Sequence, residues 1–430
     1  MAQASTATLD AAPAAARHVR LLPLVLVVSL FFLWGVANNL NDVLVAQFKK
    51  VFTLSDFEAG LVQSAFYLGY FLVAIPAGVF MRRYGYKGAI IFGLLLYGAG
   101  ALLFWPAAAA ATYGMFLAAL FVIAGGLAFL ETSANPLVTL LGPPETAAAR
   151  LNWAQAFNPL GSITGILIGQ HFIFSGIEHT RAEQAAMGEV ARQAYLASEA
   201  TAVQMPYLVI GLVVLGWALL VALTRFPDTS ARQPYVHPRR GTLAGLLSDG
   251  RFMAAVLAQF FYVGAQVSVW SYLIRYVQST MPGTPAREAA NFLTAALVCF
   301  MIGRFVGAAL MKYFKPARML AVFAAIDAAL ALMAVLASGP VGVYALVACS
   351  FFMSVMYPTI FALAVEGRDD GERKFGSSVL VMSIIGGAVV TAATGALSDM
   401  GGIATAMLVP LLCFVVVLLF ACRHWRTAAG

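Results

Sequence analysis

Twelve apolar runs of about 20 residues follow one another along this 430-residue chain, and a helix of that length can cross a bilayer. Hydrophobic side chains make up 61% of the sequence and charged ones 10%, whereas a soluble domain is roughly 45–50% apolar and about 25% charged. The strands of a membrane β-barrel alternate every second residue, and these runs do not. The sequence therefore predicts an all-α polytopic membrane protein with twelve transmembrane helices.

The predicted spans fall into two sets of six. They cover residues 21–47, 57–81, 88–108, 113–141, 152–175 and 204–225, then 252–279, 288–311, 318–337, 340–365, 375–397 and 402–422. The polar segment 226–251 between them contains three prolines, as expected of a linker. We expect six-helix bundles at 21–226 and 251–422, a cytoplasmic linker at 227–250, and cytoplasmic tails at 1–20 and 423–430. Two related, pseudo-symmetric bundles of this kind are the layout of major facilitator transporters.

The distribution of Lys and Arg predicts the orientation. With the termini inside, the inner segments hold about nineteen basic residues and the outer loops hold five. Because cytoplasmic loops carry the excess of Lys and Arg, both termini and the linker are expected to be cytoplasmic. The net charge of +7 follows from this asymmetry, so it does not indicate a nucleic-acid partner. The partner that the composition predicts is a lipid bilayer.

Glu131 is the only charged residue between Tyr113 and Leu141. A charge at the middle of a membrane costs several kcal/mol and normally faces a cavity or a partner. Asp42 poses the same problem in the first span, and the first six spans contain no buried basic residue that would pair with either carboxylate. Burial disfavours the charged form of a carboxyl group. We therefore expect Asp42 and Glu131 to couple transport to protons, with Glu131 acting as a proton or sugar ligand.

Amides and aromatic residues form stripes in the same spans. The candidate substrate-binding residues are Trp34, Asn38, Asn39, Asn135, Gln155, Asn158, Gln259, Tyr262, Gln266, Trp270 and Tyr357. Amides and carboxylates pair with sugar hydroxyls, and the faces of Trp and Tyr pack against the C–H surface of a pyranose. Hydrogen bonding between helices is the alternative for each single amide. Pro159 removes a backbone donor and so frees the carbonyl of Gln155.

Arg304 and Asp327 are the two charges predicted inside the eighth and ninth spans. Arg304 lies eight residues from Lys312, and Asp327 lies nine from Arg318. Both are therefore roughly 12–14 Å from the cytoplasmic ends of their helices. Since these spans are antiparallel neighbours, we expect a structural ion pair between them, with a role in coupling as the alternative.

Six blocks of the chain resemble the L-fucose/proton symporter family of the major facilitator superfamily. They are "FFLWGVANNLNDVL", "QSAFYLGYFLVAIPAG", "LETSANPLVTLLGP", "AVLAQFFYVGAQVSVWSYLIRY", "FMSVMYPTIFAL" and "FGSSVLVMSIIGGAVVT". The resemblance implies that Asp42 and Glu131 match the family's two essential carboxylates. Asn39, Gln155 and Asn158 match polar cavity positions. Arg82 departs from the superfamily's loop signature, which usually has Asp at that position, and Asp327 has no recognised counterpart.

The resemblance implies proton-coupled import of a neutral monosaccharide, most closely L-fucose, by alternating access. We expect a monomer in a bacterial inner membrane, with a proton gradient as co-substrate and no other cofactor. Related glucose/galactose carriers tend to have Gln where this chain has Glu131, so they are the nearest alternative. A channel would need a continuous polar pore. A membrane enzyme would need catalytic or metal-ligand spacings, which the five histidines and four cysteines lack.

Overall fold

The computed structural model describes residues 21–52, 56–173, 183, 186–226, 243–337 and 339–427. The predicted tail at 1–20 and most of the predicted linker lie outside these ranges. Within them the regular structure is helical throughout. The first half contains α1 (Leu21–Val51), α2 (Asp56–Ala109), α3 (Tyr113–Leu140), η1 (Pro144–Thr146), α4 (Ala147–Gln155), α5 (Phe157–Ile168), η2 (Gly169–Ile173), α7 (Glu189–Thr201) and α8 (Gln204–Leu223).

The second half begins with a short helix that precedes the spans. It contains α9 (Leu243–Leu247), α10 (Gly250–Thr280), α11 (Ala286–Leu310), α12 (Pro316–Leu336), α13 (Pro340–Met353), α14 (Met356–Val365), α15 (Asp370–Met382), η4 (Ser383–Ile385), α16 (Gly386–Gly401), α17 (Ile403–Ala406) and α18 (Leu408–Thr427). Helix α10 starts where the predicted linker ends.

The described helices account for the twelve predicted spans. Nine described segments are long and apolar enough to cross a membrane. One of them, Ala65–Ala109, holds two predicted spans on either side of Gly85, whose φ of 74° is a conformation that glycine adopts readily. A shorter apolar helix over Leu22–Asn38 and the broken α4–α5 segment supply the other two. The prediction of an all-helical, twelve-span fold is confirmed.

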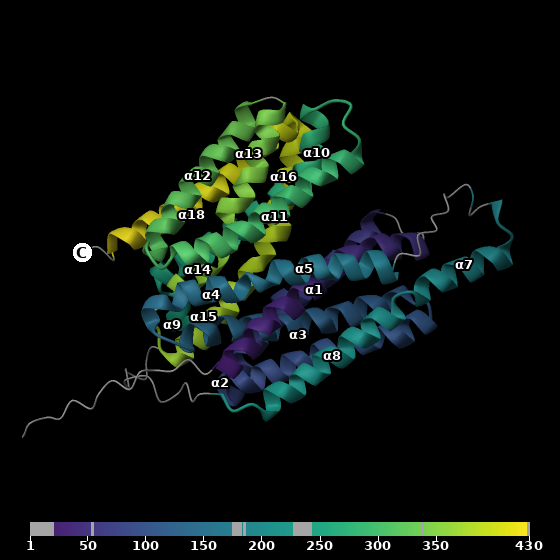
Figure 1. Cartoon of the computed structure of the whole chain (residues 1–430), viewed down its shortest axis with the longest axis horizontal. Coiled ribbons are helices and arrows are strands. Elements are labelled where there is room, and N and C mark those ends of the chain that lie inside the picture. The colour runs from purple at the N-terminus through teal and green to yellow at the C-terminus, as the bar shows by residue number, and fades with distance from the viewer. Residues whose placement is uncertain are drawn as a thin grey trace, which may run out of the picture.

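The helices form two bundles that are joined at one end. Figure 1 shows the first bundle, from α1 to α8, inclined to the second, which runs from α10 to α18. The bundles touch where α4 meets α11 and α14, and where α15 meets α2 and α3. One hydrophobic core includes residues of both bundles. A second core, around Tyr276 and Val343, belongs to the second bundle alone. The bundles therefore meet at the α4–α15 end, called the closed end below, and diverge toward the other end (Figure 1).

Equivalent helix pairs in the two bundles approach each other at glycine. In the α1–α5 pair, a Cβ added to Gly161 would lie 2.0 Å from the carbonyl oxygen of Phe32. In the α10–α16 pair, a Cβ on Gly386 would lie 2.1 Å from the carbonyl oxygen of Phe260. Small residues allow such backbone contact in membrane helices. The first and fifth spans of each bundle thus pack in the same way, as two related bundles require.

Gly161→Ala is expected to lower thermal stability, because the added methyl group must push α1 and α5 apart. Overpacking of this kind costs about 1–3 kcal/mol. The matched control is Gly216→Ala in α8, where an added Cβ meets nothing within 4 Å. That change should be neutral or slightly stabilising. The measurement is the melting temperature of the two purified variants in detergent, and equal temperatures would contradict the proposed contact.

Two helix breaks face the contact between the bundles. The first lies between α4 and α5, and Pro159 follows it; the second lies between α13 and α14, and Pro358 follows it. Proline has no N–H, so the carbonyl four residues earlier loses its helical donor. The carbonyls concerned are those of Gln155 and Ser354. Both remain available for contacts outside their own helix.

Candidate functional site

Glu131 lies in α3 at the place where the two bundles meet. Its side chain is only 1% exposed. Oε1 accepts a short hydrogen bond from the hydroxyl of Tyr357, at the start of α14. Oε2 has no hydrogen-bond partner among the described residues. The lone carboxylate of the fourth span thus contacts the opposite bundle and keeps one oxygen available.

Buried polar groups with unused hydrogen-bonding capacity surround this contact. Tyr70 in α2 lies near Trp34 and within electrostatic range of Glu131 and Tyr357, and Gln259 in α10 lies near Tyr357. The Tyr70 hydroxyl, the Trp34 indole N–H and both amide atoms of Gln259 have no partner of ordinary hydrogen-bond geometry within the described parts of the chain. Buried polar groups are normally satisfied. This arrangement is therefore typical of a site that binds a polar ligand or water.

Sequence reasoning missed Tyr70. It is 4% exposed and stands in an apolar span with no periodic polar stripe to mark it. Its only signal was its position in one of the six blocks on which the family resemblance rests. Since the opposing helices α1 and α3 bring its partners to it, its role depends on tertiary contacts.

The predicted amides of the first bundle divide into two groups. Gln155 donates through Nε2 to Oδ1 of Asn135 at 2.9 Å, and Nδ2 of Asn135 is buried without a partner. Oδ1 of Asn38 is likewise buried and unpartnered among the described residues. Asn158, in contrast, donates to the carbonyl of Phe31 at 3.3 Å. The side chain of Asn158 thus joins two helices, which is the alternative to sugar binding that the sequence left open for each amide.

The predicted residues of the second bundle also differ in their contacts. Tyr262 is fully buried, its ring centre lies 6.4 Å from that of Tyr357, and its hydroxyl has no hydrogen-bond partner of ordinary geometry among the described residues. Trp270 donates to the hydroxyl of Ser350 at 3.2 Å, so its indole N–H is already engaged. Gln266 is half-buried on the same helix. Tyr262, like Gln259 on the same helix, lies next to Tyr357.

Two predicted residues of the first span cannot be placed. The backbone of α1 continues through Asn39 and Asp42, but their side chains lie outside the described part of the structure. The proposed role of Asp42 in proton coupling stays a prediction.

The predicted ion pair between Arg304 and Asp327 is wrong for this conformation. Both residues are described and buried. Neither carboxylate oxygen of Asp327 has a hydrogen-bond partner among the described residues. Arg304 instead donates through Nε to the carbonyl of Ser354 and through Nη1 to the carbonyl of Gln155, both at 2.9 Å.

The acceptors of Arg304 are the two carbonyls that proline leaves without a helical donor. Gln155 precedes Pro159 by four residues, and Ser354 precedes Pro358 by four. Each carbonyl is a strong acceptor that would otherwise be unsatisfied in a buried place. Arg304 therefore satisfies the carbonyls at both helix breaks and joins the bundles, and these carbonyls take the place of the acid as its partners.

A second set of contacts closes the same end of the molecule. The Tyr86 hydroxyl in α2 donates to Oδ1 of Asp370 at 3.1 Å, across the interface. Nζ of Lys374 lies 2.6 Å from Oδ2 of Asp370 and 5.1 Å from the centre of the Tyr86 ring. Arg82 lies 4.7 Å above the ring of Phe375. Arg82, the departure from the superfamily's signature, therefore contacts the opposite bundle through an aromatic ring.

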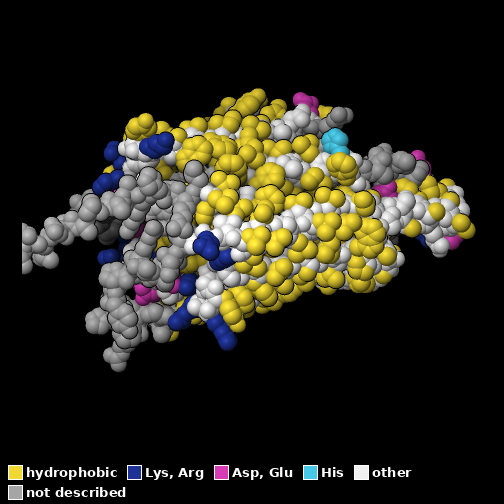
Figure 2. Space-filling model, turned by 60° about the horizontal axis from the view of Figure 1, so that its bottom comes forward, with side chains coloured by type: hydrophobic (Ala, Val, Ile, Leu, Met, Phe, Trp, Pro, Cys, Tyr) yellow, Lys and Arg dark blue, Asp and Glu magenta, His cyan; other side chains and the backbone are white. Residues whose placement is uncertain are grey.

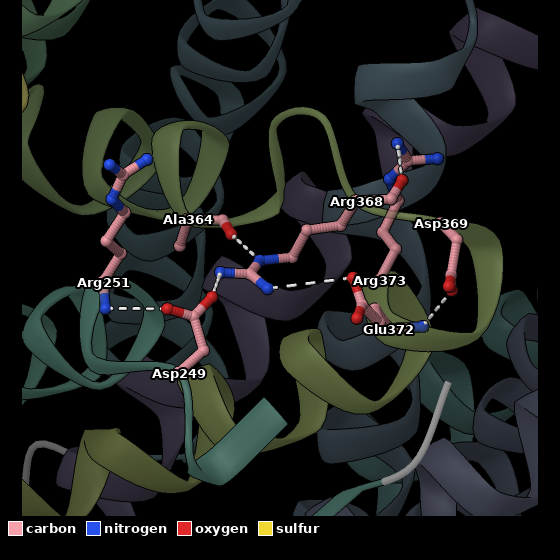
Figure 3. Close-up of polar contacts among 7 residues, drawn as sticks. All are labelled: Asp249, Arg251, Ala364, Arg368, Asp369, Glu372 and Arg373. Atoms are coloured by element: carbon pink, nitrogen blue, oxygen red, sulfur yellow. Dashed lines mark hydrogen bonds and ion pairs between the residues drawn. The ribbon is translucent and has the colours of Figure 1, made fainter. Parts of the chain in front are cut away.

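An ionic network holds the start of α10 to α15 at this end. Figure 3 shows Arg368 between Asp249 and Glu372, with Nη2 at 2.7 Å from the former and Nη1 at 3.8 Å from the latter. Arg368 also donates to the carbonyl of Ala364 at 2.7 Å. Partial burial acts to raise the pKa of Asp249, but the hydrogen bonds from Arg368 and from the main chain of α10 bring it below its ordinary value. The network holds α15 in place where it packs against α2 and α3 of the first bundle.

Among the described residues, no group of three or more His, Cys, Asp or Glu side chains is placed so that it could hold a metal ion. Residues 25–383 match the Major Facilitator Superfamily profile. The chain belongs to the major facilitator superfamily.

Relatives within the superfamily match nearly the whole chain. The L-fucose-proton symporter of Escherichia coli (strain K12) is 48% identical over 416 residues, which cover 95% of this chain and 94% of the relative. A glucose/galactose transporter of Brucella abortus biovar 1 is 36% identical over 389 residues, with 90% of each chain covered. A crystal structure of a major facilitator transporter, FucP, in the outward conformation superposes with a TM-score of 0.86 at 48% identity, covering 94% of this chain and 98% of that one.

Proposed function

We propose that this major facilitator protein imports a neutral monosaccharide together with a proton, and that L-fucose is its preferred sugar. The observation that carries the proposal is the hydrogen bond from Tyr357 to the buried carboxylate of Glu131, which joins the two bundles. It places a group that can bind a proton at the point that must separate during alternating access. The similarity to an L-fucose-proton symporter supports the choice of sugar.

The groups around Glu131 suit a polyhydroxylated ligand. Trp34 and Asn135 present buried N–H donors, and Gln259 presents both a donor and an acceptor. A sugar hydroxyl can donate one hydrogen bond and accept others, so it can satisfy this mixture. The rings of Trp34 and Tyr357 can cover the apolar C–H face of the same sugar. A neutral ligand fits because Arg304, the nearby buried cation, is already engaged by two carbonyls.

Proton binding by Glu131 is linked to closure through Tyr357. The ionised carboxylate can only accept hydrogen bonds, whereas the protonated acid can also donate one. Protonation therefore changes the contact between α3 and α14 and frees the site to engage the sugar. Asp42 is the second proposed proton carrier. The proton gradient serves as co-substrate, and no organic cofactor is proposed.

We place the closed end in the cytoplasm, so that the structure faces outward. Exposed basic residues lie at helix ends, connections and kinks at this end: Arg82, Arg83, Lys312, Lys315 and Arg318. Figure 2 shows most Lys and Arg side chains gathered toward the left end of the view, and an apolar surface along the flank. This is the asymmetry of a protein whose basic loops are cytoplasmic. We propose a monomer in a bacterial inner membrane with both termini cytoplasmic.

One proton per sugar supplies enough free energy to accumulate the sugar against a concentration gradient. A proton entering down about 100 mV supplies roughly 2.3 kcal/mol, and each tenfold sugar gradient requires about 1.4 kcal/mol. The membrane potential alone then sustains a gradient of roughly fiftyfold.

In proteoliposomes with an inward pH gradient, L-fucose is expected to compete best against radiolabelled L-fucose uptake. L-galactose and D-arabinose should compete more weakly, since they keep the L-galacto ring stereochemistry but lack the methyl group of fucose. D-glucose should compete weakest, because it lacks that stereochemistry and also brings an extra hydroxyl to the aromatic surface that covers the methyl group of fucose. A protonophore should abolish accumulation in the same vesicles. Competition by D-glucose equal to that of L-fucose would assign the protein to the glucose/galactose branch, which the Brucella relative represents.

A further inference from the structure

Asn152 is a buried amide that the proposed sugar site does not use. It lies in α4, one turn before Gln155, and its side chain is fully buried. Its Nδ2 donates to the carbonyl of Ala148 in the same helix at 2.9 Å and to Oγ1 of Thr359 in α14 at 3.2 Å. The bond to Thr359 crosses from the first bundle to the second. Asn152 therefore belongs to the contact that holds the bundles together.

Arg304 holds the same helix one turn further along. It donates through Nη1 to the carbonyl of Gln155, the last residue of α4, and through Nε to the carbonyl of Ser354 in its own bundle. Its helix α11 lies directly against α13, since a Cβ added to Gly303 would lie 2.2 Å from the carbonyl oxygen of Phe351. Arg304 thus reaches α4 from a firmly held place in the second bundle.

Both contacts end on α4, a nine-residue helix. It packs against α11 and α14 of the second bundle as well as α1 and α3 of its own. At its last residue, the side chain of Gln155 bonds to Asn135 in the candidate sugar site at 2.9 Å. The helix therefore connects the sugar site to the contact at the closed end. A sugar that leaves through that end has to pass it.

We propose that α4 is the inner gate of the transport pathway, held shut by two contacts on its own residues. The first depends on Pro159, which lacks the N–H that would otherwise occupy the carbonyl of Gln155 and so leaves that carbonyl to Arg304. The second is the bond from Asn152 to Thr359. Pro159 and Asn152 are then positioning residues for the conformational step, because opening the closed end breaks both contacts.

The test measures how readily the closed end opens. A single cysteine replaces Ala148 in a background without the four native cysteines. Ala148 is 7% exposed and lies one turn before Asn152, so a thiol there is shielded while the end is closed. Its rate of alkylation by a charged maleimide, in detergent with saturating L-fucose at pH 6, follows the open fraction when opening is fast relative to the reaction. A cysteine at Tyr313, which is 82% exposed, should react equally fast in every variant.

Pro159→Ala supplies the missing N–H and leaves the polar side chains of the site in place. We expect about tenfold faster alkylation, because the carbonyl of Gln155 gains a helical donor and its bond to the charged Arg304 is weakened. Adding Arg304→Gln to this variant should change the rate little further, as coupled residues require. The matched control is Pro106→Ala in α2, roughly 30 Å along the helix from the turn at Gly85, which should leave the rate unchanged.

Thr359→Val removes the acceptor of Asn152 with little change in side-chain size. We expect about fivefold faster alkylation, because a neutral hydrogen bond between the bundles is lost. The matched control is Thr394→Val in α16. Thr394 also bonds to a carbonyl of its own helix and to a second side chain, Ser268, at 3.0 Å, but both partners lie within the second bundle. This control should react at the rate of the background.

The inference rests on alternating access, which belongs to the proposed function, but not on the identity of the sugar. Unchanged rates in both Pro159→Ala and Thr359→Val, beside measurable alkylation of the background, would overturn the gate alone. A background that is never alkylated would overturn alternating access, and this inference with it. Equal acceleration by Thr394→Val would also contradict the gate, since it would show a general loosening of the fold.

Discussion

Glu131→Gln is expected to abolish accumulation of sugar against a gradient. Gln cannot carry a proton, so the proton gradient no longer drives the step at which Tyr357 and Glu131 separate. The ratio of internal to external sugar should fall from roughly fiftyfold at about 100 mV to about one. Binding of sugar should persist at reduced affinity, because the amide still offers a hydrogen-bond acceptor near Tyr357. The measurement is uptake into proteoliposomes with an imposed pH gradient and potential.

The matched control is Tyr357→Phe, which removes the donor and leaves the acid in place. It should slow uptake while some accumulation survives, because Glu131 can still bind and release a proton. Accumulation by Glu131→Gln to the level of the unaltered protein would remove Glu131 from the coupling mechanism. The sugar site could then stay as proposed, but the transport mechanism would need a different proton carrier, and Asp42 would be the first candidate.

Gly78→Val is expected to force open the end of the molecule that is closed in this structure. A Cβ at Gly78 would lie 2.0 Å from the hydroxyl oxygen of Ser378 and 3.3 Å from the carbonyl oxygen of Lys374. These neighbours belong to the opposite bundle, so the collision is relieved by separating the bundles rather than by unfolding either one. Overpacking costs about 1–3 kcal/mol, which corresponds to a shift of about 5- to 150-fold between the two arrangements.

Spin labels at Tyr84→Cys and Tyr313→Cys, which are 54% and 82% exposed and belong to different bundles, report this shift by pulsed electron resonance as growth of the longer of two distances. Ser378→Gly in the Gly78→Val variant removes the group that collides and should restore part of the short distance. Gly216→Val is the control, since an added Cβ there meets nothing within 4 Å. A Gly78→Val protein with the distance distribution of the control would show that this contact does not resist opening.

Several features of the fold could be predicted because their causes are local in the chain. The length of each apolar run determines whether it spans a bilayer, so the twelve spans follow from the sequence. The missing N–H of Pro159 frees the Gln155 carbonyl whatever the tertiary structure, and α4 ends there. The cost of a charge in lipid made Glu131 a candidate site residue before its contact with Tyr357 was known.

The sequence by itself therefore determined the spans, the freed carbonyl of Gln155 and the burial of Glu131, Arg304 and Asp327, since each depends on composition or on residues within a few positions. Only the tertiary structure decided which groups meet. Tyr357 and Glu131 are separated by 226 positions in the sequence. Arg304 donates to the carbonyl of Gln155, 149 positions away, and does not pair with Asp327, which is nearer in the sequence. Such choices depend on how two bundles are docked and on which carbonyls are left unsatisfied at their interface. A hydrophobic pattern does not encode that docking, because lipid and neighbouring helices are equally apolar surroundings.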